Sequence, residues 1–361
     1  GLVQRPTVVG GGREIVVTPV PEGYTAYQKT LEARIKSIRE RSGRPAKGDD
    51  IILRVISDGR FSAIDMRFVN PTQGSDPDSK LNRMLDDVIE AYRDTADWEY
   101  HTDATPDQKR GASLMVFTDI GLGEASAKNR GFDMKDWITK RLIEGGVAPD
   151  HIAFMRDNNS HAKKEKLFSD MRQGNKRILI GGKDMETGVN AQKRLSHLFH
   201  LDSPWFPASI EQREGRIVRQ GNQNKTVKIR AYATKGSYDS TMWGMNARKQ
   251  RFITQAMQGN DSIRAMDDVS EASSFEMASA LASGDERYLK VAGLRSDVDR
   301  LGRLFSAHEK EQRNIRSQLE RTEWFKDYYG KKIAELEAAI ARALPVSGAD
   351  FAAMVDGVEV K

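Results

Sequence analysis

Residues 212–221 read QREGRIVRQG, and they indicate the fold more strongly than any other stretch of the chain. Gln212, Arg216 and Arg219 stand at positions i, i+4 and i+7, so on a helix they would share one face. A guanidinium group stays charged at physiological pH and donates paired hydrogen bonds to phosphate oxygens. The spacing therefore predicts a phosphate clamp, and Gly215 beside Arg216 leaves room for a ligand to approach.

A solvated basic helix is the alternative interpretation. Glu211 and Glu214 alternate with the arginines and would form charge pairs along a helix surface. Arg213 and Arg230 are interpreted as such surface charges. We favour the clamp because the five positions of Q-x-x-G-R-x-x-R-x-G rarely match by accident and the surrounding sequence supports it.

Short apolar runs alternate with amphipathic segments around this decapeptide. Strands are expected at 112–117, 151–155, 177–181, 197–201 and 226–233, and helices near 131–145, 160–173, 207–219 and 238–257. The alternation predicts an α/β fold in which helices cover both faces of a parallel sheet. Ligands bind such sheets at the carboxyl ends of the strands, so loops 118–123, 182–190 and 202–208 are expected to share one edge.

The segment 177–243 resembles the second RecA-like lobe of superfamily-two helicases, in particular the Swi/Snf-type DNA translocases. The sixth motif of that family, Q-x-x-G-R-x-x-R-x-G-Q, is matched at Gln212, Gly215, Arg216, Arg219 and Gly221, and the chain departs from it at Asn222. The fifth motif is matched at Gly188 and Asn190, and the stretch D-x-x-W-N-P at Asp202, Trp205 and Pro207. LMVFTDIG at 114–121 matches the fourth motif.

This resemblance implies the second motor lobe of an ATP-dependent helicase or translocase that acts on double-stranded DNA. Arg216 and Arg219 would be the catalytic arginines that reach the γ-phosphate. The nucleotide contacts implied are Gln212, Gly188, Asn190 and Gly215, and the DNA contacts implied are Thr118, Lys183, Thr187 and Trp205. Trp205 suits a structural plug equally well, and Asp202 suits a cap for the helix entered through Pro207.

The fifth motif departs from the family at its start. The family has a Ser-Thr-Lys run there, whereas this chain has Gly181, Gly182 and Lys183. The hydroxyl groups that would contact the DNA backbone are therefore missing, and Thr187 or backbone amides are the expected substitutes.

Half of a helicase active site is missing from the sequence. It contains no G-x-x-x-x-G-K-[ST] loop and no D-E-x-H box, and the cluster Gly10–Gly12 is interpreted as a linker. ATP and Mg²⁺ are therefore expected to be bound mainly by a first lobe of the same polypeptide, and the chain reads as a piece of a longer protein. Six scattered histidines and no cysteine predict no metal site of its own.

A narrower likeness is to large phage and mobile-element proteins that join a methylase-like region to a helicase of this type. It implies a methylase-like partner region and a place in the bacterial host cytoplasm or in a phage particle. The chain has 38% hydrophobic and 30% charged residues, a net charge of +5, and no apolar run long enough to span a membrane.

Three regions are expected along the chain. Residues 1–98 would be an inter-lobe linker, with a strand at 13–20 and helices at 22–41, 49–69 and 79–97. Residues 99–260 would be the RecA-like lobe, and 261–361 a helical tail. The tail has an apolar seam of 4-3 spacing from Leu294 to Ile340, interrupted by His308, Gln312, Thr322 and Lys326. The seam predicts an imperfect coiled coil or an antiparallel helical hairpin, or a helix packed on its own domain.

Two functions stay open at this point. The first is the ATP-dependent DNA translocase lobe. The second is a non-enzymatic DNA-binding or assembly module of a large phage or mobile-element protein. The retained arginine pair favours the first, because a scaffold needs neither guanidinium.

Overall fold

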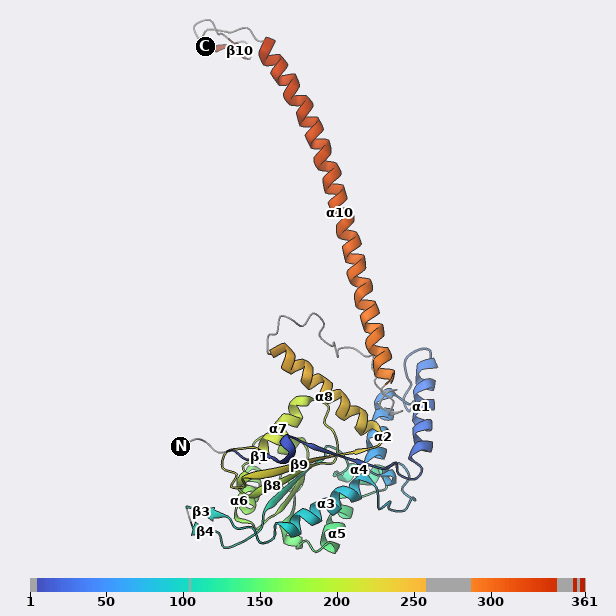
Figure 1. The fold of residues 1–361 in the computed structure, drawn as a ribbon. Helices are drawn as coiled ribbons and strands as arrows, with labels where there is room; N and C mark the ends of the chain where they lie inside the picture. Colours follow the sequence, from blue (N-terminus) through green and yellow to red (C-terminus); the bar gives the residue numbers. More distant parts are fainter. Residues whose placement is uncertain (1–4, 104, 258–286, 343–352, 356–357, 361) are drawn as a thin grey trace. The chain divides into compact units, whose positions relative to one another are not determined.

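The computed structural model describes residues 5–103, 105–257, 287–342, 353–355 and 358–360. Its centre is a seven-stranded sheet in the order β1-β9-β8-β5-β7-β6, with β2 also paired to β9 (Figure 1). Every strand pair in this sheet is parallel. Its strands are β1 (Thr7–Val8), β2 (Glu14–Thr18), β5 (Ser113–Phe117), β6 (Ile152–Phe154), β7 (Ile178–Gly181), β8 (Leu195–His200) and β9 (Thr226–Thr234).

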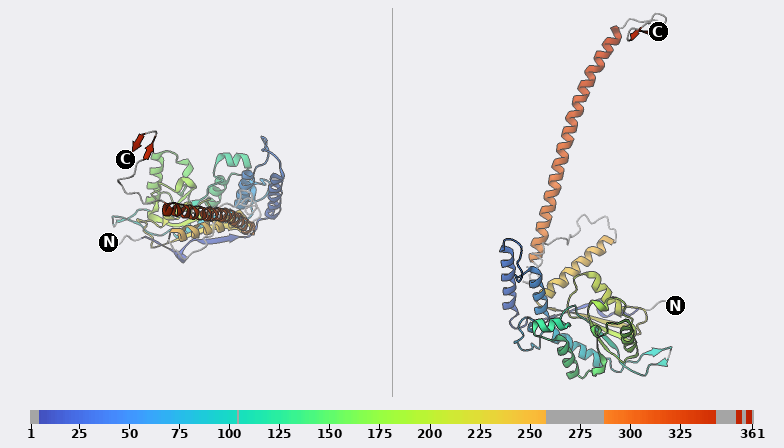
Figure 2. Two further views of the ribbon diagram at one scale, coloured as in Figure 1. Left: turned by 90° about the horizontal axis from the view of Figure 1, so that it is seen from above. Right: turned by 180° about the vertical axis from the view of Figure 1, so that it is seen from behind.

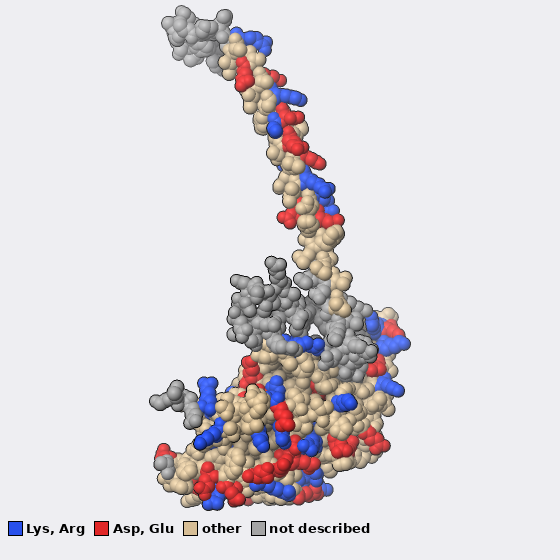
Figure 3. Space-filling view, in the orientation of Figure 1, with Lys and Arg blue, Asp and Glu red and all other residues tan. Residues whose placement is uncertain are grey.

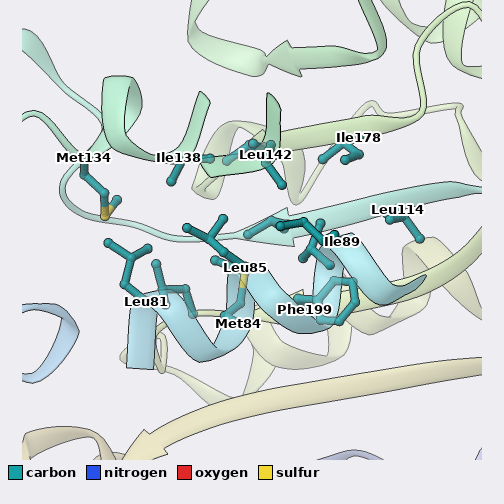
Figure 4. Close-up of a cluster of buried hydrophobic side chains, with 14 of the residues drawn as sticks. Leu81, Met84, Leu85, Ile89, Leu114, Met134, Ile138, Leu142, Ile178 and Phe199 are labelled. Carbon is teal, nitrogen blue, oxygen red and sulfur yellow. The ribbon is translucent and has the colours of Figure 1, made fainter. Parts of the chain in front are cut away.

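Both faces of the sheet are buried under helices. Successive side chains of a strand point to opposite faces, so Leu114 and Val116 of β5 join one hydrophobic cluster while Met115 and Phe117 join the other. Helices α3 (Lys80–Asp94) and α5 (Met134–Glu144) cover the first face (Figure 4). Helices α6 (His161–Gln173) and α7 (Pro207–Ile217) cover the second. The predicted α/β fold with helices on both faces is confirmed.

The N-terminal segment is built into this sheet. Strand β2 runs along β9 from Glu14 beside Arg230 to Thr18 beside Thr234. Helix α3 begins where the Ser79 side chain accepts a hydrogen bond from Asn82 N, and it buries Leu81, Leu85 and Val88 in the main core. Helices α1 (Tyr24–Glu40) and α2 (Ile52–Ile64) form a smaller cluster of their own.

Some short elements were not expected from the sequence. Helix α4 (Glu124–Arg130) lies between two glycines, and its cap residue Gly131 has φ +70°. Strands β3 (His101–Thr102) and β4 (Thr105–Pro106) form an antiparallel pair outside the main sheet. Helix α8 (Tyr238–Met257) follows β9 at the expected position.

The described residues fall into two compact units, 1–295 and 296–361. The second unit contains most of helix α10 (Arg287–Arg342) and the small pair β10 (Ala353–Val355) and β11 (Val358–Val360). Helix α10 is continuous in every view (Figures 1 and 2). The predicted alternative of an antiparallel helical hairpin within residues 287–342 is therefore wrong. Among the described residues, no helix has the length and apolar character needed to cross a membrane.

Candidate functional site

The motif loops meet at the carboxyl edge of the sheet. Asp119 N, after β5, donates to the Asp202 carboxylate, after β8, at 3.2 Å. Arg213 of α7 donates to Asp119 Oδ1 at 2.6 Å and to Glu186 Oε1, after β7, at 2.9 Å. These bonds join the three loops, so their predicted common edge is confirmed.

Helix α7 carries most of the decapeptide but ends before Arg219. The helix begins with Pro207 in its first turn, where a backbone N–H has no helical partner in any case. It ends at Ile217, because Val218 leaves the helical conformation with ψ 56°. The predicted helix to residue 219, with one stripe that includes Arg219, is therefore wrong at its end.

Asn222 holds the chain where α7 ends. Its side-chain amide donates to Ile217 O at 3.0 Å and to Leu195 O at 2.8 Å. The last carbonyl of the helix is thereby satisfied from outside the helix, and the following loop is tied to the start of β8. The asparagine that replaces the motif's final glutamine thus has a structural role.

Arg216 and Arg219 meet at the fifth-motif loop despite the early helix end. Val189 O accepts from Arg216 Nη1 at 3.4 Å and from Arg219 Nη1 at 3.5 Å, and Arg216 Nη2 donates to Glu186 O at 2.6 Å. Arg216 Nε is buried without a hydrogen-bond partner. Burial and the neighbouring charge of Arg219 lower the pKa of Arg216.

Neither guanidinium has a counter-charge within the described part of the chain. The ion pairs found there include no carboxylate within 4.0 Å of Arg216 or Arg219, and their partners are the backbone carbonyls just named. Two adjacent cations without an anion repel one another. Their placement therefore suits an anion that bridges both side chains.

The remaining residues assigned to the nucleotide lie at the same edge. Gln212, Gly188 and Asn190 are exposed. Gly188 adopts the left-handed conformation with φ +72°, which favours glycine. A Cβ atom at Gly215 would meet no atom within 4 Å, so packing inside the chain does not explain this glycine.

The sequence predicts Arg213 to be a surface charge, and this prediction is wrong. Its side chain is 0% exposed, and it lies over the Phe117 ring at 5.2 Å. Besides Asp119 and Glu186, its Nη1 atom lies 4.0 Å from Asp202 Oδ1. We call Arg213 and its three carboxylate partners the buried charge cluster. The helical spacing of Ile210, Arg213 and Ile217 is the signal that could have revealed it.

Asp202 belongs to this cluster and does not cap α7. The residue before the helix is Phe206, which makes no side-chain cap. Arg60 Nη2, from α2, donates to Asp202 Oδ2 at 3.3 Å. Burial, together with the charge of Asp119, raises the pKa of Asp202 to about 6.

The four residues assigned to DNA have different surroundings. Lys183 and Thr187 are exposed on the fifth-motif loop. Thr118 is buried, and its hydroxyl donates to Ile120 O at 2.9 Å within its own loop. Trp205 is partly buried against the Tyr238 ring at 6.3 Å and the Arg60 guanidinium at 5.7 Å.

Close packing accounts for the two glycines that open the fifth motif. A Cβ atom at Gly182 would lie 2.6 Å from Thr118 O, and one at Gly181 would lie 2.8 Å from Met155 Cβ. Neither position has space for the serine or threonine of the family.

Two further features bear on the charges of the lobe. Arg230 is not a free surface charge, because it pairs with Glu14 at 2.9 Å and with Asp87 at 3.4 Å. On the face shown in Figure 3, basic and acidic side chains are interspersed over the lobe. No group of three or more His, Cys, Asp or Glu side chains suited to a metal ion occurs among the described residues.

Comparison with known proteins agrees with the motifs. Residues 135–221 match the family described as helicase conserved C-terminal domain. Over 151 residues, or 42% of this chain, the sequence is 30% identical to the defense against restriction protein B of Escherichia phage P1. Over 120 residues, or 32% of the chain, it is 32% identical to the DNA repair protein RAD5A of Arabidopsis thaliana. The matches span only 6% and 12% of these two relatives.

The fold is also that of a solved motor core. The Sulfolobus solfataricus SWI2/SNF2 ATPase core, solved in complex with double-stranded DNA, matches 74% of this chain and 49% of its own. The TM-score is 0.50 at 16% identity. Residues 135–221 thus carry a helicase conserved C-terminal domain, the chain has the fold of a SWI2/SNF2 ATPase core, and both findings support the resemblance seen in the motifs.

Proposed function

We propose that this chain is the second lobe of an ATP-dependent DNA translocase and supplies arginines to an ATP site that a first lobe completes. The observation that carries the proposal is the meeting of Arg216 and Arg219 at Val189 O, without a carboxylate partner in the described structure. A phosphate group between them would provide the missing counter-charge. It would also give the unpartnered Arg216 Nε an acceptor.

The two guanidiniums would act on the transferring phosphoryl group. Donors placed where negative charge develops stabilise the transition state more than the ground state. Gln212, Gly188, Asn190 and the open space at Gly215 would line the nucleotide at this edge. The β-phosphate and Mg²⁺ would be held mainly by the first lobe of the same polypeptide, whose motifs this sequence lacks.

One loop would couple the nucleotide to DNA. Loop 182–190 presents Lys183 and Thr187 to solvent and, a few residues later, offers Val189 O to both arginines. A shift of the arginines toward a phosphate would break or move these carbonyl contacts and so displace the loop. Lys183 and Thr187 would contact the DNA backbone, while Thr118 and Trp205 would position that edge from within.

The alternative is a non-enzymatic DNA-binding or assembly module. The match to a phage protein of which it spans 6% favours a very large parent protein in a phage particle or its bacterial host, in which a methylase-like region would be a further partner. The alternative leaves the carboxylate-free arginine pair without a use. We therefore place it second.

Arginine substitutions in the two-lobe protein test the proposal. With DNA present, Arg216→Ala or Arg219→Ala should lower kcat for ATP hydrolysis by about 10³-fold, as expected for arginines that stabilise a transferring phosphoryl group. Affinity for ATP should fall far less, because these side chains act mainly in the transition state. The measurement is steady-state ATPase beside nucleotide affinity and thermal unfolding.

The control must be an arginine outside the edge. Arg110 is 60% exposed in a surface pair with Glu99, and it precedes β5, at the opposite end of the strands. Arg110→Ala should leave kcat unchanged. Normal hydrolysis by the Arg216 and Arg219 variants would refute the clamp and leave the module as the better account.

A further inference from the structure

The seam of helix α10 keeps one heptad phase for its whole described length. Spacings of 4 and 3 alternate without a break from Leu294 to Ile340, and no turn interrupts the helix. With Leu294 at d, the a positions include Phe305, Gln312, Leu319, Lys326, Ile333 and Ile340. The d positions include Leu301, His308, Ile315, Thr322, Tyr329 and Leu336.

The apolar side chains of this seam are exposed among the described residues. The exposed fractions of its apolar side chains run from 50% at Ile315 to 73% at Ile340. Apolar side chains that recur at a and d positions are the surface by which helices associate as coiled coils, and here ten of the fourteen a and d positions from Leu294 to Ile340 are apolar or aromatic. The feature is independent of the ATP site proposed above.

We propose that α10 pairs with α10 of a second copy of this chain as an antiparallel two-stranded coiled coil, centred between Leu319 and Thr322. In an antiparallel pair each a residue faces a d residue of the partner, g faces g, and e faces e. This centre sets Phe305 opposite the partner's Leu336 and Leu301 opposite the partner's Ile340. The seam from Leu301 to Ile340 is thereby paired in both chains, whereas Leu294 and Val298 lie outside the paired segment, because the positions opposite them fall past Arg342 at the end of α10.

Charge complementarity selects this register. Glu311 and Lys332, both at g, face one another across the pair, and so do Arg316 and Glu323, both at e. Symmetry makes each attraction occur twice, and no like charges meet. A shift of one heptad sets Glu309 against the partner's Glu323 in one direction and against the partner's Glu337 in the other. Both neighbouring registers therefore bring carboxylates together.

The polar seam residues select the orientation. In a parallel, in-register pair every residue faces itself, so Lys326 would meet a second lysine inside the seam. In the antiparallel pair Lys326 lies opposite the partner's Ile315, and Gln312 lies opposite the partner's Tyr329. A long lysine can extend past an isoleucine and keep its ammonium group in water, whereas two facing lysines repel.

Mass and disulfide trapping of the full 361-residue chain test this pairing. Sedimentation should give a particle of twice the 40.5 kDa chain mass. The chain has no cysteine, so any disulfide that forms must involve the introduced cysteines. A mixture of Gln312→Cys and Tyr329→Cys chains should cross-link on oxidation. Gln312→Cys alone should not, because its copy would lie about 26 Å away along the axis.

Charge reversal gives a second readout. Glu311→Lys should raise the dimer dissociation constant roughly tenfold, since two attractions become two repulsions. Adding Lys332→Glu to the same chain should restore it. Glu320→Lys, at a b position outside the seam, is the matched control and should change little. A monomer at all accessible concentrations would overturn the proposal, and so would efficient self-cross-linking of Gln312→Cys.

Discussion

Arg213→Ala should destabilise the lobe far more than any ordinary surface substitution. The side chain is fully buried, and three carboxylates surround it, at 2.6 Å for Asp119, 2.9 Å for Glu186 and 4.0 Å for Asp202. Removing one partner of a buried ion pair costs about 3–5 kcal/mol, because the remaining charge is left without compensation. Two details reduce the expected loss. Asp119 is 22% exposed, and Asp202, whose pKa is already raised to about 6, can take up a proton.

We therefore expect a loss of about 3 kcal/mol, a large part of the 5–15 kcal/mol that stabilises a typical domain. Urea unfolding of the chain, followed by circular dichroism, measures it. Arg110→Ala, at a 60% exposed site, should shift stability by no more than about 0.5 kcal/mol.

A second variant separates charge from packing. Arg213→Met keeps much of the side-chain volume but leaves the carboxylates unpaired, so it should be nearly as unstable as Arg213→Ala. Combining it with Asp119→Asn and Glu186→Gln should recover part of the loss, because the uncompensated charges are removed. If Arg213→Ala unfolds at the same urea concentration as Arg110→Ala, the buried charge cluster does not hold the motif loops together.

Three other predictions concern the same edge. The folded-state pKa of Asp202 is raised from 3.8 to about 6. The protonated form therefore contributes stability that is fully present below pH 3.8 and is lost as pH rises through 6. Asp202→Asn should remove this loss of stability between pH 4.5 and pH 7, measured as the urea midpoint of unfolding at each pH. Gly182→Ala would place a Cβ 2.6 Å from Thr118 O and should cost about 1–3 kcal/mol. A Cβ at Gly215 would meet nothing within 4 Å, so Gly215→Ala should raise the free energy of unfolding by up to about 1 kcal/mol. In the two-lobe protein the same variant should lower the ATPase rate. An ATPase rate equal to that of the unchanged protein would contradict close approach of a ligand at Gly215.

The five strands β5 to β9 were predictable because they are apolar runs bounded by polar loops, whereas the two-residue strand β1 was not expected. Both faces of the sheet are buried, with Leu114 of β5 on one face and Met115 on the other, so continuous hydrophobicity alone identified β5 and β7. Helix α4 was missed because EASAKNR has no apolar periodicity and no buried residue. The pair β3 and β4 has two residues in each strand, too few for an alternation pattern.

The candidate site was predictable in its chemistry but not in all of its geometry. The motif spacing identified Arg216 and Arg219, and the structure brings both to Val189 O. The helix end at Ile217 was missed because it depends on the Asn222 side chain, whose tie to β8 is a tertiary contact. Local helical spacing carries no information on such a contact.

Arg213 shows the opposite limitation. A charged residue counts as polar in any pattern of amphipathicity, so Arg213 was interpreted as a surface charge although it shares a helix face with Ile210 and Ile217. The carboxylates that make its burial possible come from three loops distant in sequence. Only the assembled fold shows that the charge is compensated.

ATP hydrolysis by this chain alone, compared with the chain after addition of the first lobe, decides whether it contributes half of an active site. The sequence has neither a phosphate loop nor a D-E-x-H box, so the isolated chain should show no ATPase above background. Addition of the first lobe with DNA should restore hydrolysis, and chain carrying Arg219→Ala should fail to restore it. Robust hydrolysis by the isolated chain, unchanged by Arg216→Ala and Arg219→Ala, would contradict the half-site account.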